Sequence, residues 1–206
     1  MGLTFFDPRT GAPREFRPAA PPAVGLDAAD LGPRGKILAE AVADALEFLG
    51  LRTRPGSDLR VGGADPGPNS AWLTAAPVVG QALGPAALAA LGFLPEDFRF
   101  LCLKVHYRRP LALSREALAA ARAELAELRA HERALSGVSL EPSSRGRAGY
   151  LHRFREALSK DLDLPAALAT VWDGLRPGAL SPGSRAALVR ETFPALGLAR
   201  PSAGPK

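Results

Sequence analysis

A dense group of cationic and aromatic side chains lies between two helical patterns near the middle of the chain. The group consists of Lys104, His106, Tyr107, Arg108 and Arg109. Arginine forks match the geometry of phosphate oxygens, and a tyrosine ring can stack on a nucleic-acid base. These residue types therefore predict a contact with a polyanion such as RNA. The alternative, which is the more common situation, is structural: the histidine and tyrosine hydrogen-bond to hold an inter-helix corner, and the arginines are solvated.

A second candidate site is the glycine pair Gly62-Gly63, whose backbone N–H groups can cradle a phosphate. The pair lacks the strand, loop and Gly-Lys context that makes phosphate loops specific, so a plain turn is the competing and more common explanation. Asp161 and Asp163 resemble paired acids, but their place before Pro165 favours a helix cap.

No catalytic residue and no metal site can be nominated from the spacing of reactive side chains. The three histidines, His106, His131 and His152, are scattered, with no i,i+4 pair and no cysteine partner. The one cysteine, Cys102, lies in an apolar helical run, which predicts a buried, inert thiol and excludes a disulfide within the chain. We expect no cofactor.

Length and charge leave the class of partner open. The 206 residues suffice for one medium domain or two small ones with a buried core. A net charge of +5 and a pI near 10.0 suit nucleic-acid binding, but arginine greatly outnumbers lysine, as expected from a GC-rich coding sequence, which weakens that argument. The N-terminus lacks the pattern of a signal peptide, and no apolar stretch approaches the roughly 20 residues of a membrane span. We therefore expect a cytoplasmic protein without membrane contact.

The first half of the chain combines short strand patterns with one strong helix pattern. Turn residues between two apolar segments predict an opening hairpin, and a strand, helix, strand order predicts a small βαβ-like unit. Gly50 is expected to close the helix in a Schellman cap. The expected elements are a hairpin over 3–18, an extended connector over 18–23, a strand at 24–26, a helix over 33–49, strands at 51–53 and 59–61, and Ala-rich helices at 71–83 and 85–91.

Helical patterns dominate the second half. The first helix there is stopped by Pro110, because the residue before a proline avoids the α region. Ser114 is a good N-cap for the next helix, whose apolar residues recur at helical spacing. The expected elements are helices over 98–107 and 114–135, a flexible Ser/Gly/Arg linker over 136–149, helices at 150–160, from Pro165 and from Ser181-Pro182, and a disordered tail over 199–206.

Several segments, in a shared order, resemble the class I cysteinyl-tRNA synthetases. The sequence FLCLKVHYRRPLALS, from Phe100 to Ser114, resembles the HYR-x-PL-x-x-S corner that leads from the catalytic half of that family into a long helix. The sequence Gly62-Gly63-Ala64-Asp65 is similar to the GG-x-D beside the family's cysteine pocket, which implies a ligand-binding role for Gly62, Gly63 and Asp65. Weaker similarity covers the hairpin at 7–18, the helix at 34–53, the DLDLP segment at 161–165 and the FPALGL ending at 193–198.

The departures from this family concern its catalytic signatures. Asp30-Leu31-Gly32-Pro33 stands where the family has His-Ile-Gly-His, whose histidines stabilise the phosphates during adenylate formation. Ala86–Phe93 contains no lysine where the family has its KMSKS-type loop, so the cation that stabilises the pyrophosphate is missing. Asn69, Ser70 and Ala71 stand in place of a zinc-ligand segment. The family's insertion and its anticodon-binding domain have no counterpart.

The resemblance implies a mainly α protein with a small α/β part. Residues 1–94 would form a reduced Rossmann-like, nucleotide-binding remnant, residues 95–198 a helical bundle, and residues 199–206 a disordered tail. The implied function is that of a truncated, catalytically inactive relative, a pseudoenzyme that binds tRNA, the full-length synthetase or another protein. The alternative is a small-molecule protein, either a nucleotide or amino-acid binder or a ligase-type enzyme, that uses the remnant pocket around Gly62 to Asp65.

Overall fold

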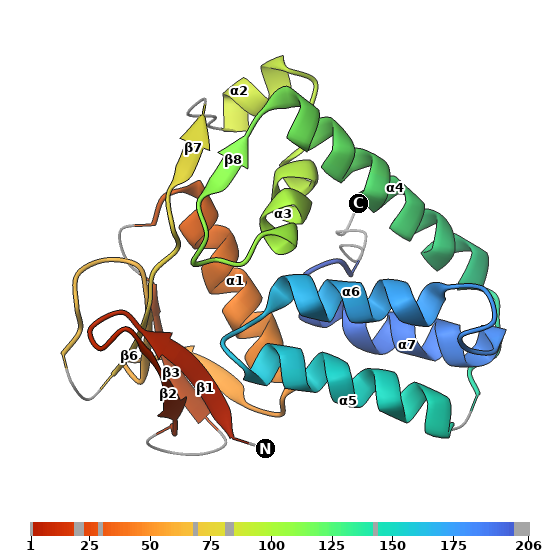
Figure 1. Cartoon of the computed structure of the whole chain (residues 1–206), viewed down its shortest axis with the longest axis horizontal. Coiled ribbons are helices and arrows are strands. Elements are labelled where there is room, and N and C mark those ends of the chain that lie inside the picture. The colour runs from red at the N-terminus through yellow and green to blue at the C-terminus, as the bar shows by residue number, and fades with distance from the viewer. Residues whose placement is uncertain are drawn as a thin grey trace, which may run out of the picture.

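The computed structural model describes residues 2–18, 23–28, 31–67, 70–80, 85–141 and 144–199. Within these residues the chain is mainly helical and contains a small parallel sheet, as the sequence predicts (Figure 1). Most of the expected connector (19–22) and nearly all of the expected disordered tail (200–206) lie outside the described residues, as do Asp30 and Asn69.

The chain opens with the predicted hairpin, formed by β1 (Leu3–Asp7) and β2 (Ala12–Phe16) in antiparallel pairing. Its turn is local: the Gly11 N–H donates to the Asp7 carbonyl at 2.9 Å, and Gly11 takes a φ of 69°, which favours glycine. The rings of Phe5 and Phe16 are diagonal neighbours across the hairpin, with centroids 5.6 Å apart. The hairpin therefore has an apolar face for packing.

A four-stranded parallel sheet follows, in the order β4-β3-β5-β6. Its strands are β3 (Ala23–Ala28), β4 (Arg52–Pro55), β5 (Leu59–Val61) and β6 (Ala71–Leu73). Helix α1 (Pro33–Phe48) joins β3 to its neighbour β4, which confirms the βαβ unit. The Schellman cap is confirmed as well, because the N–H groups of Gly50 and Leu51 donate to the carbonyls of Glu47 and Leu46 at 2.9 and 2.8 Å.

The connection from β4 to β5 crosses β3, because these two strands pair with opposite edges of it. Two glycines make the crossing possible: a Cβ on Gly56 would lie 2.8 Å from Gly25 Cα. The Gly25 N–H also donates to Asp58 Oδ2 at 2.7 Å, which ties the connection to the strand beneath it. A short extended segment therefore makes the crossover between parallel strands, which in larger parallel sheets is usually made by a helix.

The expected helix over 71–83 is wrong for residues 71–80, and residues 81–83 lie outside the described residues. Residues 71–73 form β6, which pairs with β5, and Val78–Gly80 form β7, which pairs in parallel with β8 (Leu111–Leu113). The Ala-rich composition suggested a helix, but Pro77 interrupts it, and the β-branched Val78 and Val79 suit a strand. The sequence patterns predict no strand at the position of β8. The expected helix at 85–91 is confirmed as α2 (Pro85–Ala90).

The helix before the corner ends earlier than expected. Helix α3 runs Pro95–Lys104, and Val105 is already extended, so the helix stops well before Pro110. Leu111 then pairs with Val78, which places the basic corner between a helix and a strand rather than between two helices.

Four helices complete the described part of the chain, and each begins with a side-chain N-cap. Ser144 caps the second of them through the Arg147 N–H, so that helix starts at Arg145 and the expected linker over 136–149 is too long. Figure 1 shows the last three lying side by side, while the first runs along another edge of the molecule. The helices are α4 (Arg115–Leu135), α5 (Arg145–Ser159), α6 (Leu164–Leu175) and α7 (Pro182–Ala195).

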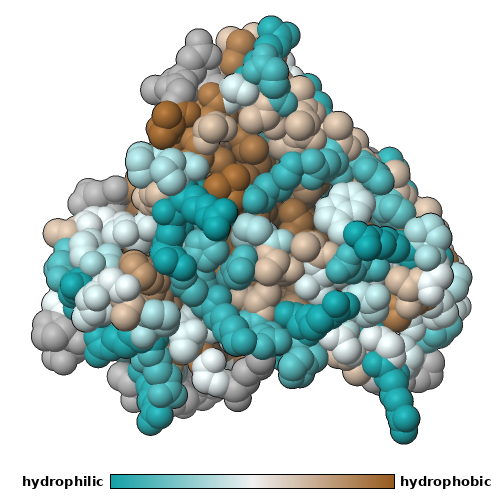
Figure 2. Space-filling view, viewed as in Figure 1, coloured by the Kyte–Doolittle hydropathy of each residue, from teal (hydrophilic) through white to brown (hydrophobic). Residues whose placement is uncertain are grey.

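The buried core is continuous from the hairpin and sheet, through α1 and α3, into the C-terminal helices. Phe100 and Phe154 are among its largest fully buried side chains. Figure 2 shows hydrophilic surface where the sheet side of the molecule meets the helices, with an apolar area above it over β7 and β8. The basic corner lies at this meeting of sheet and helices.

Candidate functional site

The backbone of the basic corner is held by Arg34, from the first turn of α1. Its Nη1 donates to the carbonyls of Ala76 and Arg109 at 2.8 and 2.6 Å, and its Nη2 donates to those of His106 and Val105 at 3.1 and 3.3 Å. Only 5% of Arg34 is exposed, and burial lowers the pKa of its guanidinium. Sequence reasoning missed this residue, although a single arginine beside an apolar helix face was the available signal.

The two rings of the corner are engaged within the protein. Tyr107 is buried, and its hydroxyl donates to Asp161 Oδ1; burial, and then this hydrogen bond, raise the pKa of the tyrosine. His106 stacks on Tyr107 with ring centroids 4.8 Å apart, and its Nδ1 accepts from the Arg108 N–H at 3.3 Å. Burial lowers the pKa of His106. Contact with a polyanion at this corner therefore depends on its cationic side chains.

The three cations of the corner differ in how firmly they are held. Lys104 pairs with Glu124 on α4. Arg108 lies 4.3 Å above the ring of Phe6, and its Nε lies 2.7 Å from an oxygen of Asp161. Arg109 is exposed, and within the described residues its side chain makes no hydrogen bond or ion pair.

These cations line one open cleft of about 620 Å³. The opposite wall is the turn between α5 and α6, which adds a fourth cation, Lys160. We call this the corner cleft; its lining is Lys104, Val105, His106, Arg108, Arg109, Lys160, Asp161, Asp163 and Pro165.

The two acids of the corner cleft have different tasks. Asp163 caps α6, accepting from the Ala166 N–H at 3.1 Å, as the sequence predicts. Asp161 does not cap this helix, so that expectation is wrong for it. Its carboxylate reaches the opening hairpin instead, where Oδ1 accepts from the Phe6 N–H at 2.7 Å.

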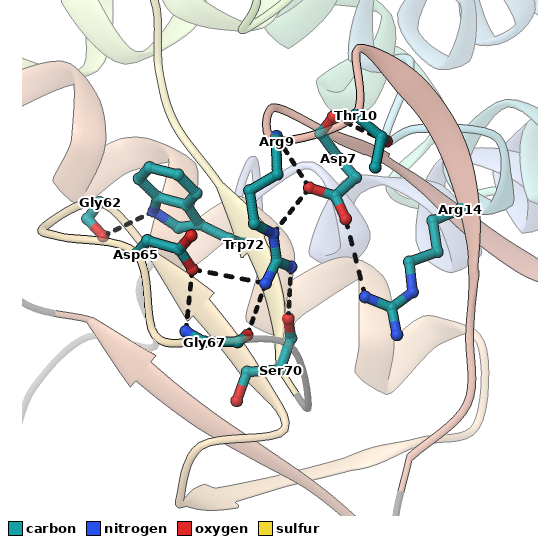
Figure 3. A network of polar contacts seen from close by, with 9 residues as sticks. All are labelled: Asp7, Arg9, Thr10, Arg14, Gly62, Asp65, Gly67, Ser70 and Trp72. Carbon is teal, nitrogen blue, oxygen red and sulfur yellow. Dashed lines mark hydrogen bonds and ion pairs between the residues drawn. The ribbon is translucent and has the colours of Figure 1, made fainter.

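The glycine loop is a tight turn after β5. Gly62 and Gly63 have φ values of 75° and 63°, which strongly favour glycine, and the Gly62 carbonyl accepts from Trp72 Nε1 at 3.2 Å. Asp65 Oδ1 accepts from the Gly67 N–H at 2.8 Å and from Arg9 Nη1 at 3.4 Å (Figure 3). The loop is thus fastened to the hairpin through Arg9.

Gly62 and Gly63 also line a cleft of about 430 Å³, which we call the strand-end cleft. It lies beyond the carboxyl ends of β5 and β6 and beside the first turn of α1, at the place where the order of the sheet changes direction. Open parallel sheets bind ligands in such a crevice. Asp65 is not in its wall, which consists of Leu31, Gly32, Pro33, Arg34, Gly35, Gly62, Gly63, Thr74, Ala75, Ala76, Pro77 and Val78.

The remaining reactive groups form no further site. Among the described residues, no group of three or more histidine, cysteine, aspartate or glutamate side chains is placed to hold a metal ion. Cys102 is buried, as predicted, and burial raises the pKa of its thiol to about 12. None of the helices in the described part of the chain is long and apolar enough to cross a membrane.

Comparison with known proteins finds partial matches of one kind, and no protein-family model matches the chain. The cysteine–tRNA ligase of Thioalkalivibrio sulfidiphilus is 42% identical over 79 residues, which are 38% of this chain and 16% of that protein. Cysteine–tRNA ligase 1 of Burkholderia lata is 36% identical over 107 residues, 52% of this chain and 22% of that protein. The matched stretches therefore span less than a quarter of these relatives.

Proposed function

Because the chain is a relative of the cysteine–tRNA ligases, we propose that it acts by binding tRNA, without aminoacylating it. The observation that supports this proposal best is the corner cleft, where Lys160 joins Lys104, Arg108 and Arg109 from a distant segment of the chain. The sequence pattern pointed to three of these cations, and the fold adds the fourth. A cluster of this kind contacts the phosphates of an RNA backbone and does not read its bases.

The composition of the strand-end cleft supports the absence of aminoacylation. Leu31 and the N-cap residue Gly32 precede α1 and Pro33 begins it, at the position where a synthetase would present donors to ATP phosphates. Among the described residues of the wall, the charged one is Arg34, whose guanidinium is turned to the carbonyls of the corner. A cleft lined in this way offers little stabilisation to the charge that develops on pyrophosphate. We expect no ATP–pyrophosphate exchange with cysteine, and measurable exchange would contradict this part of the proposal.

The fold is consistent with a reduced nucleotide-binding remnant over 1–94 and a bundle over 95–198, and we keep this division as a proposal. The β3-α1-β4 unit and the switch in strand order are features of Rossmann-like sheets. The loop between β5 and β6 carries no described helix, which distinguishes this sheet from a full doubly wound one.

A gel-shift titration with total tRNA at two salt concentrations tests the RNA proposal. The variant Arg108→Ala/Arg109→Ala removes two cations from the corner cleft, and Arg52→Ala/Arg54→Ala removes two exposed arginines from β4, outside the cleft. We expect salt-dependent binding that the first variant weakens and the second leaves nearly unchanged. Equal losses in both variants would show a response to net charge alone. No binding at low salt would contradict the proposal and direct the search to a protein partner, such as the full-length synthetase.

A second candidate function is small-molecule binding in the strand-end cleft, as a nucleotide or amino-acid binder or a ligase-type enzyme. The observation that favours it is the position of the cleft, at the carboxyl ends of parallel strands beside a helix N-terminus. A thermal-shift titration with ATP, AMP and cysteine tests it, because a bound ligand raises the unfolding temperature. No stabilisation by any of the three would rule out these ligands.

A further inference from the structure

Asp161 has an unusual backbone conformation in the turn between α5 and α6. Its φ is 57° and that of Leu162 is 49°, so two consecutive residues with side chains lie in the left-handed region. Residues with side chains rarely adopt this region, and they persist there where the surroundings fix them. Here the Asp161 N–H donates to the Thr4 carbonyl at 2.7 Å, and Lys160 forms a bridge with Thr4. The turn is therefore held against β1 with its carboxylate aimed at the corner.

The two carboxylate oxygens of Asp161 have separate surroundings. Oδ1 accepts hydrogen bonds from the Phe6 N–H and the Tyr107 hydroxyl, which join the hairpin to the corner. Oδ2 faces Arg108 Nε at 2.7 Å and His106 Nε2 at 3.7 Å. Oδ2 is buried and accepts no well-aligned hydrogen bond from the described residues, so its contact with Arg108 is one of charge. The first oxygen is structural, and the second neutralises a cation of the cleft.

We propose that Asp161 is an internal competitor for the phosphate that Arg108 would bind. This inference rests on the proposed tRNA binding at the corner cleft. The acids that pair with Lys104 and Lys160 are Glu124 and Glu156, which are not part of the cleft wall, whereas Asp161 neutralises its cation inside the cleft. A phosphodiester must displace Oδ2 from Arg108 before it gains that contact.

The geometry allows this exchange without unfolding the corner. Arg108 lies over the ring of Phe6, and 42% of its side chain is exposed, so the guanidinium can rotate toward solvent while it stays on the ring. The hydrogen bonds of Oδ1 need not change. Displacement of Asp161 weakens the binding of any anion at Arg108. A ligand with several phosphates can offset this loss through its contacts with Arg109 and the lysines, whereas a single anion cannot. Asp161 thus makes the cleft selective for polyanions.

The substitution Asp161→Asn separates the two roles of the carboxylate. Asparagine keeps an Oδ1 that accepts from Phe6 and Tyr107, replaces Oδ2 with an amide, and tolerates the left-handed region well. The matched control is Asp163→Asn, which removes the same charge from the same cleft and remains a good N-cap. Tyr107 and Arg108 are unchanged in both.

Fluorescence titration with total tRNA over a series of salt concentrations provides the test. For Asp161→Asn we expect about 2- to 5-fold tighter binding, the range that release of a partly exposed ion pair allows. We also expect a log–log salt slope steeper by about 0.7 to 0.9, because the carboxylate displaced in the native protein takes up a cation, which cancels the counterion released by one phosphate contact. Asp163→Asn should leave the slope unchanged, and Asp161→Asn should have no effect in an Arg108→Gln background.

Other outcomes separate this inference from the proposed function. Weaker binding by Asp161→Asn, or equal slopes for the two aspartate variants, would overturn the competitor role. Binding by Asp161→Asn without binding by the native protein would support the competitor role and contradict native tRNA binding. Failure of both to bind would overturn both proposals. If the variant does not fold, the inference can be tested on the native protein instead. The Arg108 Nε–H signal in a ¹⁵N spectrum should shift when tRNA is added. A signal that does not move while tRNA is bound would refute the exchange.

Discussion

Replacing Arg34 with methionine should destabilise the protein by about 3 kcal/mol. The substitution keeps most of the side-chain length but leaves the four carbonyls of Ala76, Val105, His106 and Arg109 without their shared donor. A hydrogen bond from a charged group contributes about 1.5 kcal/mol or more, so the two shorter bonds, at 2.6 and 2.8 Å, account for about 3 kcal/mol. Loss of the two longer bonds increases the expected destabilisation, while removal of the buried charge reduces it.

Urea denaturation followed by circular dichroism measures this loss, with Arg52→Met on the exposed strand β4 as the control. In a chain of 206 residues, 3 kcal/mol corresponds to about 6 to 12 °C in the unfolding temperature. Arg34→Lys should fall between wild type and Arg34→Met, because an ammonium has three donors but not the flat fork. A loss below about 1 kcal/mol for Arg34→Met would refute the view that Arg34 holds the corner.

Three further predictions concern packing, reactivity and pH. Gly56→Ala places a methyl group 2.8 Å from Gly25 Cα and should lower the free energy of unfolding, measured in urea, by about 1 to 3 kcal/mol. The control Gly137→Ala, whose methyl group meets nothing within 4 Å, should lower it far less. Equal losses in the two variants would contradict the close crossing at Gly25. Cys102 should resist a thiol reagent such as DTNB in the native state and react fully in urea, since its thiol is buried with a pKa near 12; rapid native labelling would contradict this. Because the pKa of His106 is lowered in the folded protein, this histidine takes up a proton in the unfolded chain at a higher pH than in the folded one. The stability of wild type relative to His106→Asn should therefore fall as the pH drops below 6.5. A difference that stays constant with pH would refute the view that burial lowers this pKa.

Sequence reasoning succeeded where the determinants of structure are local. The hairpin turn at Gly11, the Schellman cap at Gly50 and the N-cap at Ser114 each depend on residues within one or two turns of the chain. The three-residue strands β6, β7 and β8 depend on pairing with distant segments, as in the register of Val78 with Leu111, and composition does not encode that pairing. An Ala-rich segment was therefore read as a helix.

The candidate site divides in the same way. The corner residues were found because they are consecutive, and their motif could be read directly. Arg34 contacts this corner from more than 70 residues away, and Asp161 reaches Phe6 across 155 residues. Their roles follow from which backbone groups the fold brings near them. The local signals, an arginine beside an apolar helix face and an acid ahead of Pro165, do not reveal these distant contacts.

The contact between Asp161 and the opening hairpin also sets an order of events during synthesis. Strands β1 and β2 can pair as soon as they leave the ribosome, but the acceptor for the Phe6 N–H is made 155 residues later. Closing so long a loop carries an entropic cost that the intervening elements must first reduce by folding. The hairpin can pack on β6 and bond the Gly67 and Ser70 carbonyls through Arg9 as soon as these are made, but its contact with Asp161 must wait for the turn between α5 and α6. The first strand to be made therefore gains its last contacts only after most of the chain has been synthesised.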